Sequence, residues 1–317
     1  MEIRQYHADD EKQLVALWNE VLWADKICLE FFREKLLLEP NIIDDGIFIA
    51  EESGKMAGAV IAWTRTTAQP WGFEGVSEEQ KDTGFMLPLL IAPEHKNSGL
   101  GKELLEKSEK YLIALGKKYF SVCEYNPLFF LNGLDKESYP ELHNFYLKNQ
   151  YRQNRISYSM RIDLHKYVIP EDTRQIEKKL LTENITFSVC KPELFLAARK
   201  FLAKEFPRWL NNFIYKVQKI DTSSEIMLAL RGAEAVGFCQ YNYYGQQERV
   251  GPFGVSESLR GKKVGHVMVA KLCERMTEKG FQSAYFSSCV EGVKNFYGRN
   301  GFKVYKEKTI FTKEVSA

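Results

Sequence analysis

The sequence lacks the features that mark several classes of protein. Lysine and arginine total 44 and aspartate and glutamate 42, so the formal charge of +2 gives no excess for neutralising the phosphates of a nucleic acid. No stretch reaches the ~18 consecutive apolar residues of a membrane span, and the first residues contain no apolar signal segment. These absences favour a cytoplasmic protein that binds neither nucleic acid nor membrane.

The residue patterns of disulfide frameworks and metal sites are also missing. Six cysteines occur singly, with no Cys-x-x-Cys pair, and no two of the five histidines are four residues apart. We therefore expect no metal. The length of 317 residues, with 44% hydrophobic and 27% charged residues, is that of a globular protein large enough for two domains.

What the sequence does contain is an internal repeat. A short apolar run, a polar stretch with glycines and a helical pattern follow one another at residues 90–112, and the same order recurs at 253–272. Gly101 in the first stretch corresponds to Gly265 in the second, 164 residues later. The matching order of three features indicates duplication of a whole unit.

A second pair of matching segments lies further along each copy. The segment "NFYLKNQYR" at 144–152 matches "NFYGRNGFK" at 295–303, and places Tyr146 opposite Tyr297. Each copy predicts a lone strand, helical segments, a hairpin, a third strand, the glycine loop, a long helix, another strand and a helix with the tyrosine. The predicted fold class is therefore α+β, with strands and helices mixed within each unit.

The expected domain limits follow from the repeat and from a charged stretch between the copies. Residues 171–184, "EDTRQIEKKLLTEN", offer few side chains for a core and are expected to be a connector. The predicted domains are then 1–170 and 185–317.

The glycine loop between strand and helix has a physical use. A helix leaves its first N–H groups without internal partners, and glycine lets the backbone approach an anion closely, so the loop is suited to binding phosphate. The Walker pattern is excluded by Lys96 and Glu103, and the dinucleotide fingerprint by Leu104 where a third glycine is needed. A plain turn that uses glycine only for its geometry is the alternative.

Together the two loops and the two tyrosine segments resemble the GNAT superfamily of N-acetyltransferases, over nearly the whole chain and in its tandem form. The signature is Arg/Gln-x-x-Gly-x-Gly/Ala, followed later by aromatic-Tyr-x-x-x-Gly-Phe. The loop residues are Lys96, Asn97, Ser98, Gly99, Leu100 and Gly101 in the first copy and Arg260, Gly261, Lys262, Lys263, Val264 and Gly265 in the second. The sequence departs from the signature at Lys96, Gln150 and Lys263.

The resemblance implies a fold, a co-substrate and a set of site residues. Each unit would be a mostly antiparallel mixed sheet flanked by helices, and acetyl-CoA would be the acetyl donor. Tyr146 and Tyr297 would act as acids, because a phenol with a pKa near 10 can protonate a departing thiolate. Besides the two loops, the implied cofactor-binding residues are Leu90, Ile91, Lys102, Asn126 and Val255.

Two functions remain open at this point. The first is an N-acetyltransferase that moves an acetyl group directly to a primary amine of a small molecule or peptide in a ternary complex. The second is a non-catalytic acyl-CoA-binding or sensing protein, which the departures from the signature and the lack of a clear general base favour. Glu124 and Glu248 are the nearest candidates for a base, and the sequence leaves open which copy is catalytic.

Overall fold

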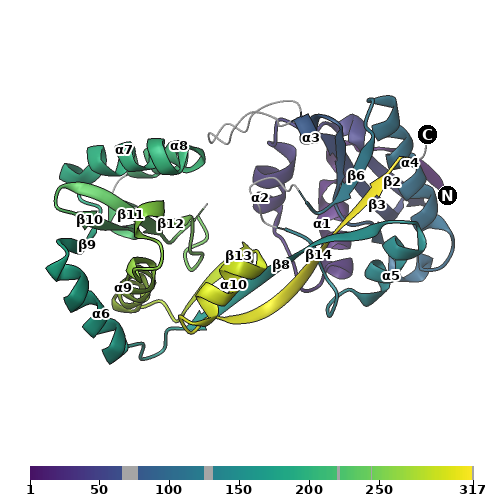
Figure 1. The fold of residues 1–317 in the computed structure, drawn as a ribbon. Helices are drawn as coiled ribbons and strands as arrows, with labels where there is room; N and C mark the ends of the chain where they lie inside the picture. Colours follow the sequence, from purple (N-terminus) through teal and green to yellow (C-terminus); the bar gives the residue numbers. More distant parts are fainter. Residues whose placement is uncertain (66–77, 125–130, 220–221, 244, 316–317) are drawn as a thin grey trace. The chain divides into compact units, whose positions relative to one another are not determined.

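The computed structural model describes residues 1–65, 78–124, 131–219, 222–243 and 245–315, and these form two compact units (Figure 1). Among the described residues, unit 1 contains 1–158 and 306–315, and unit 2 contains 159–305. Each unit is described below by itself.

Unit 1 is built on a mixed sheet with strand order β1-β2-β3-β4-β6-β14. Neighbouring strands are antiparallel except β4 and β6, which are parallel, so the predicted mostly antiparallel mixed sheet is confirmed. The short β5 pairs with β3 beyond the end of β4. The strands are β1 (Glu2–Gln5), β2 (Ile47–Glu52), β3 (Lys55–Thr64), β4 (Thr83–Met86), β5 (Leu90–Ile91), β6 (Tyr119–Val122), β7 (Leu134–Asp135) and β14 (Lys303–Glu314).

Helices cover the sheet of unit 1 on both faces. Seven consecutive residues of β3, 57–63, are buried, which a strand shows only when both of its faces are packed. Helices α1 and α4 both contact β3. The helices are α1 (Glu11–Val21), α2 (Leu29–Phe32), α3 (Glu78–Lys81), α4 (Leu100–Ala114) and α5 (Pro140–Lys148).

Helix α4 follows the spacing predicted from the sequence. Its buried face includes Leu104, Leu105, Ser108 and Leu112, the positions expected from a helical period. Leu115, which continues the same period, is 46% exposed because the helix has already ended at Ala114.

Unit 2 has a four-stranded antiparallel sheet with order β12-β11-β10-β9. Helices α7 and α8 cover one face and α9 the other (Figure 1). The elements are α6 (Glu171–Thr182), β9 (Ile185–Val189), α7 (Phe195–Glu205), α8 (Pro207–Val217), β10 (Ile226–Arg231), β11 (Glu234–Gln240), β12 (Phe253–Val255), α9 (Val264–Glu278), β13 (Ser283–Cys289) and α10 (Glu291–Gly298).

The stretch expected to be a connector is helix α6, and it packs within unit 2. Leu180 is buried, the helix contacts α9 and β9, and the carboxylate of Glu177 lies 2.9 Å from Nζ of Lys271. Residues 171–184 thus contribute to the core of unit 2.

The two copies exchange their last strands. β8 (Arg152–Asp163) ends the first copy in sequence, yet residues 159–163 belong to unit 2, where β8 neighbours β13 and the hydroxyl of Ser159 donates to the carbonyl oxygen of Ser287 at 2.8 Å. β14 ends the second copy, yet residues 306–314 belong to unit 1 and pair with β6. The compact units therefore differ from the predicted division into 1–170 and 185–317.

The exchange predicts that a change in β14 weakens unit 1. Phe311 is fully buried and its ring lies 5.5 Å from that of Tyr146 and 4.6 Å from that of His143. Phe311→Ala is expected to cost about 3–5 kcal/mol through the cavity it leaves. Hydrogen exchange should show the loss of protection in residues 119–122 of β6.

Val304→Ala on the same strand is the matched control, because Val304 is 43% exposed. It should change the free energy of unfolding by less than about 0.5 kcal/mol. Equal protection of β6 in the Phe311→Ala variant and the wild type would contradict the assignment of this strand to unit 1.

Candidate active site

A bulge between β4 and β5 opens the sheet of unit 1. Met86 pairs with Ala62 and Leu90 with Ala59, so the three residues 87–89 face only two residues of β3. Pro88 lies in this bulge and has no N–H to donate. Beyond the bulge, β5 pairs with β3 while β6 pairs with β4, so the sheet splits between β5 and β6.

The register fixes which way the amides of β5 point. The N–H of Ala92 donates to the carbonyl oxygen of Ala57 at 2.9 Å, and successive amides of a strand point to opposite sides. The amide of Leu90 therefore points toward β3, and those of Leu89 and Ile91 point away from it. In the described part of the chain no group accepts the N–H of Ile91. Of the two cofactor-binding positions predicted on this strand, Leu90 and Ile91, only Ile91 has an amide that points away from β3.

Tyr146 reaches this opening from α5. Its hydroxyl accepts the N–H of Leu89 at 3.0 Å, and the side chain is almost fully buried. Burial raises the pKa of the Tyr146 phenol above its usual value, so the hydroxyl is held protonated and is a weaker acid than the free phenol on which the predicted acid role rests. Because the oxygen is the acceptor in this bond, its own hydrogen is left for a further partner.

The loop before α4 presents a row of unpaired amides. Asn97 and Gly99 have left-handed backbones, with φ of 63° and 93°, and Gly99 is the N-cap of the helix. Among the residues that the structure describes, the N–H groups of Asn97, Gly99 and Gly101 meet no acceptor, whereas those of Lys96 and Ser98 bond within the loop. Three alternate amides beside a helix N-terminus form a concave surface for an anion.

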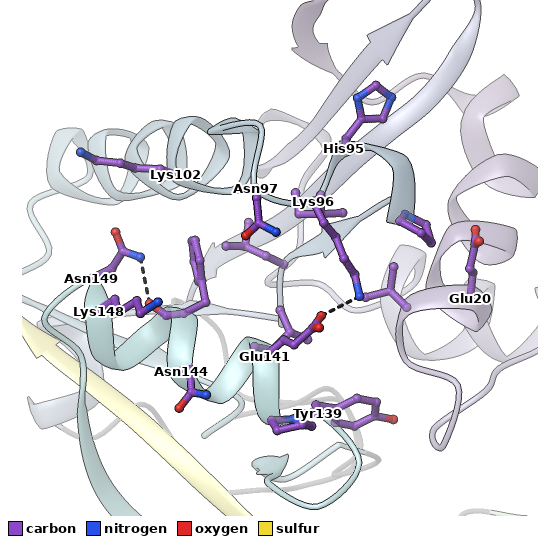
Figure 2. A pocket seen from close by; sticks show the side chains of 18 of the residues that line it. Glu20, His95, Lys96, Asn97, Lys102, Tyr139, Glu141, Asn144, Lys148 and Asn149 are labelled. Carbon is purple, nitrogen blue, oxygen red and sulfur yellow. Dashed lines mark hydrogen bonds and ion pairs between the residues drawn. The ribbon is translucent and has the colours of Figure 1, made fainter.

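A pocket of about 830 Å³ connects the loop to the bulge (Figure 2). Gly101 must be small here, because a Cβ would lie 3.2 Å from the ring of Phe145. Figure 2 shows Asn97 and Lys102 on one side of the pocket and Glu20 on the other. Its charged and polar lining includes Glu20, His95, Lys96, Asn97, Lys102, Tyr139, Glu141, Asn144, Lys148 and Asn149.

The charged residues of the pocket differ in whether they have an ionic partner. Lys96 is held by Glu141, with Nζ 2.6 Å from the carboxylate, while Lys102 lies 3.8 Å from Glu106 on its own helix. Within the described residues no ion pair involves Lys148 or Glu20. Among the described residues that line the pocket, Glu20 is thus a carboxylate without an ionic partner and Lys148 an ammonium without one.

The second copy repeats the register shift of the bulge and the left-handed turn of the loop, although its Gly251–Pro252 peptide bond is cis. Pro252 occupies the position of Pro88, and the pairing of β11 with the following strand shifts by one residue there, as it does in unit 1. Gly261 and Lys263 have φ of 81° and 63°, so Lys263 takes the left-handed N-cap conformation that Gly99 takes in the first copy. The departure of Lys263 from the signature leaves the loop conformation unchanged.

Side chains distinguish the two copies. Tyr297 stacks on Phe286 with ring centroids 3.8 Å apart, and in the described residues its hydroxyl forms no hydrogen bond. A Cβ on Gly254 would lie 2.5 Å from Phe206 and 2.7 Å from Trp209, whose rings stack 4.2 Å apart. An aromatic pair thus covers the strand of the second copy where the first has Leu90.

The predicted cofactor-binding residues fall into four groups. Those of the first copy that line the pocket are Ile91, Lys96, Asn97, Gly99, Gly101 and Lys102. Ser98 stabilises the loop by accepting the N–H of Leu100 at 3.3 Å, and Leu90 and Leu100 are buried. Val255, Arg260, Gly261, Lys262, Lys263, Val264 and Gly265 lie in unit 2. Asn126 lies outside the described residues.

Sequence reasoning missed the bulge and much of the pocket wall. Pro88 and Pro252 recur at the same offset of 164 as the loop glycines, and this repeat could have revealed the bulge. Trp23 and Tyr139 carried no such signal, because they come from segments far apart in the chain. Neither candidate base lines the pocket: Glu124 accepts the hydroxyl of Ser121 at 2.7 Å, and Glu248 that of Ser283.

Comparison with known proteins identifies the class. The model of the acetyltransferase (GNAT) family matches residues 15–127 and again 192–302, so the chain belongs to this family and contains it twice. The tandem arrangement inferred from the repeat is thereby confirmed. A search of curated proteins finds no match.

Solved structures share the tandem fold at low sequence identity. A glucosamine N-acetyltransferase region of a fungal multi-domain β-N-acetylglucosaminidase matches with a TM-score of 0.77 and 18% identity; the match covers 98% of this chain but only 38% of that one. A GCN5-related N-acetyltransferase from Sphaerobacter thermophilus gives 0.69 at 16% identity, covering 100% and 96% of the two chains. A tandem GNAT protein from the clavulanic acid pathway gives 0.62 at 14%, covering 100% and 99%.

Two absences apply to the described part of the chain alone. It contains no group of three or more histidine, cysteine, aspartate or glutamate side chains placed to hold a metal ion. None of its helices has the length and apolarity that crossing a membrane requires.

The contrast between the two tyrosines can be tested by removing each hydroxyl. Tyr146→Phe leaves the N–H of Leu89 buried without an acceptor and should destabilise unit 1 by about 1–3 kcal/mol. Tyr297→Phe removes no hydrogen bond seen in the described residues and should have a much smaller effect on unit 2. Hydrogen exchange resolved by unit measures both, and equal effects would contradict the distinction.

Proposed function

We propose that this chain transfers an acetyl group from acetyl-CoA to a primary amine of a small molecule or peptide, by direct transfer in a ternary complex in unit 1. One observation carries the proposal: the unpaired amides of the loop and the unpaired amide of Ile91 line the same pocket. Membership of the acetyltransferase family supports the reaction type.

The pocket residues fit the anionic part of acetyl-CoA. A diphosphate needs several N–H donors and nearby positive charge, and the amides of Asn97, Gly99 and Gly101 with Lys102 and Lys148 supply both. Lys96, where the signature has arginine or glutamine, places a further positive charge on this loop, and that charge is paired with Glu141.

Groups at the bulge and on the facing helices α1 and α5 carry out the steps of the proposed transfer. As the amine attacks the thioester carbonyl, negative charge develops on the oxygen, and the N–H of Ile91 is oriented to donate to it. The N–C bond forms and the C–S bond breaks, and the hydroxyl hydrogen of Tyr146 passes to the departing sulfur. The amine loses its proton to Glu20, the pocket carboxylate without a paired cation, and Tyr146 regains a proton from solvent.

The location of the site can be tested by calorimetry with acetyl-CoA. Gly101→Glu places a carboxylate among the loop amides, so we expect it to weaken binding at least tenfold. The matched change in the other copy, Gly265→Glu, should leave the affinity within about twofold of the wild type. Lys102→Glu, an exposed position, provides a second disruption with little risk to folding.

The two outcomes separate the copies. Loss of binding in Gly265→Glu and not in Gly101→Glu would place the donor in unit 2. Unchanged affinity in all variants would leave the loops as structural turns and contradict the proposal.

Turnover is tested by the release of free thiol with a panel of primary amines. The wild type should release thiol with at least one amine, and Tyr146→Phe should lower kcat about a hundredfold while acetyl-CoA affinity is retained, as expected for the loss of an acid catalyst. Saturable binding of acetyl-CoA with no thiol release from any amine would instead support a non-catalytic acyl-CoA-binding protein.

A further inference from the structure

The pocket wall opposite the loop is formed by the segment after α1. Glu20 and Val21 in the last turn of α1 and Trp23 just after it line the pocket, and Trp23 is 59% exposed. Figure 2 shows Glu20 across the pocket from Lys102. With the diphosphate on the loop amides, as proposed above, this wall is the one left for the acceptor amine.

Three side-chain contacts from α1 fix part of this segment. The indole N–H of Trp18 donates to the carbonyl oxygen of Asp25 at 2.8 Å. The amide side chain of Asn19 donates to the carbonyl oxygen of Ile27 and accepts its N–H, each at 2.8 Å. These contacts secure the end of the segment and leave the wall residue Trp23 outside them.

Tyr139 supports the segment from the start of α5. Its hydroxyl donates to the carboxylate of Asp25 at 2.7 Å and accepts the N–H of Ala24 at 3.2 Å. Its ring meets that of Trp23 edge to face, with centroids 6.4 Å apart. Tyr139 itself lines the pocket, so the position of Asp25 determines the position of two pocket residues.

Lys306 holds Asp25 from the other side. Its ammonium donates to the second carboxylate oxygen of Asp25 at 2.6 Å and to the carbonyl oxygen of Ala24 at 2.8 Å. Both side chains are less than one-fifth exposed, so the pair is stronger and more sharply oriented than a surface ion pair. Lys306 belongs to β14, the strand that the second copy contributes to unit 1.

We propose that Lys306 is a positioning residue for the acceptor side of the pocket. Through Asp25 and the carbonyl of Ala24 it fixes Trp23 and the hydroxyl of Tyr139, so the second copy shapes the amine site of the first through its exchanged strand. The effect on the acceptor rests on the function proposed above; the effect on the segment does not.

The test compares two lysines of the same strand. Lys306→Met removes the ammonium and keeps an unbranched stem of similar length. Lys313→Met is the matched control, because Lys313 is also on β14, is 20% exposed and pairs with Glu109 at 2.9 Å, yet does not line the pocket or contact its wall. Both variants lose one half-buried ion pair from unit 1.

Two measurements are made on each variant. Hydrogen exchange at residues 22–28 should accelerate about tenfold or more in Lys306→Met and stay near the wild-type rate in Lys313→Met. In the thiol-release assay KM for the amine should rise about tenfold in Lys306→Met, while the Kd for acetyl-CoA stays within about twofold. Equal exchange in the two variants, or a loss of acetyl-CoA affinity with an unchanged amine KM, would overturn the proposal.

Further variants keep the result decisive. If Lys306→Met does not fold, Asp25→Asn breaks the same ion pair and should give the same two effects. In a double-mutant cycle, adding Asp25→Asn to Lys306→Met should change the amine KM less than twofold, because each substitution breaks the same Lys306–Asp25 ion pair. If no amine is acetylated, the exchange measurement alone decides whether Lys306 positions the segment, and failure of the proposed function is seen separately.

Discussion

The candidate site depends on one irregularity in a sheet, the bulge at residues 87–89. A regular strand would bond its amides alternately to both neighbours and leave no donor for a substrate. Here residues 87–89 lie opposite only two residues of β3. Beyond them β5 still pairs with β3 but not with β6, and its alternate amides point into the opening. The hydroxyl of Tyr146 accepts the amide of Leu89, and the amide of Ile91 has no acceptor among the described residues, so the proposed acid and the proposed oxyanion donor lie at alternate amides of this segment.

The two copies exchange their last strands and differ in the side chains around the loop. Both copies keep the register shift of the bulge and the left-handed turn of the loop. Their side chains differ: Phe206 and Trp209 cover the strand in unit 2, and Tyr297 packs among aromatic rings. The second copy contributes to unit 1 in another way, through the strand that carries Phe311 and Lys306. This division of roles gives a physical reason for the two copies to remain in one chain.

The sequence predicted those features that depend on local pattern. The repeat, the glycine loop, the buried face of α4 and the two tyrosine helices all follow from spacing, and the family resemblance gave the sheet type. The exchange of strands could not be predicted, because β8 and β14 are both 12-residue strands in which five mostly exposed residues precede four buried ones, 157–160 and 308–311. Either strand would satisfy either sheet by its pattern, and the partner is set by tertiary packing.

Which amide faces the pocket could not be predicted without the register of β5 against β3. Leu90 and Ile91 are equivalent in sequence, and only the pairing of Ala92 with Ala57 shows which amide turns to the pocket. The pocket wall after α1 could not be predicted from local pattern. It depends on contacts among Trp23, Tyr139 and Lys306, which come from three distant parts of the chain.

The most direct measurement of the central claim is a crystal structure of the protein with acetyl-CoA. The account predicts the diphosphate on the amides of Asn97, Gly99 and Gly101, and the thioester oxygen within hydrogen-bond distance of the N–H of Ile91, in unit 1. A donor bound at residues 260–265, or one whose carbonyl lies away from the bulge, would contradict it.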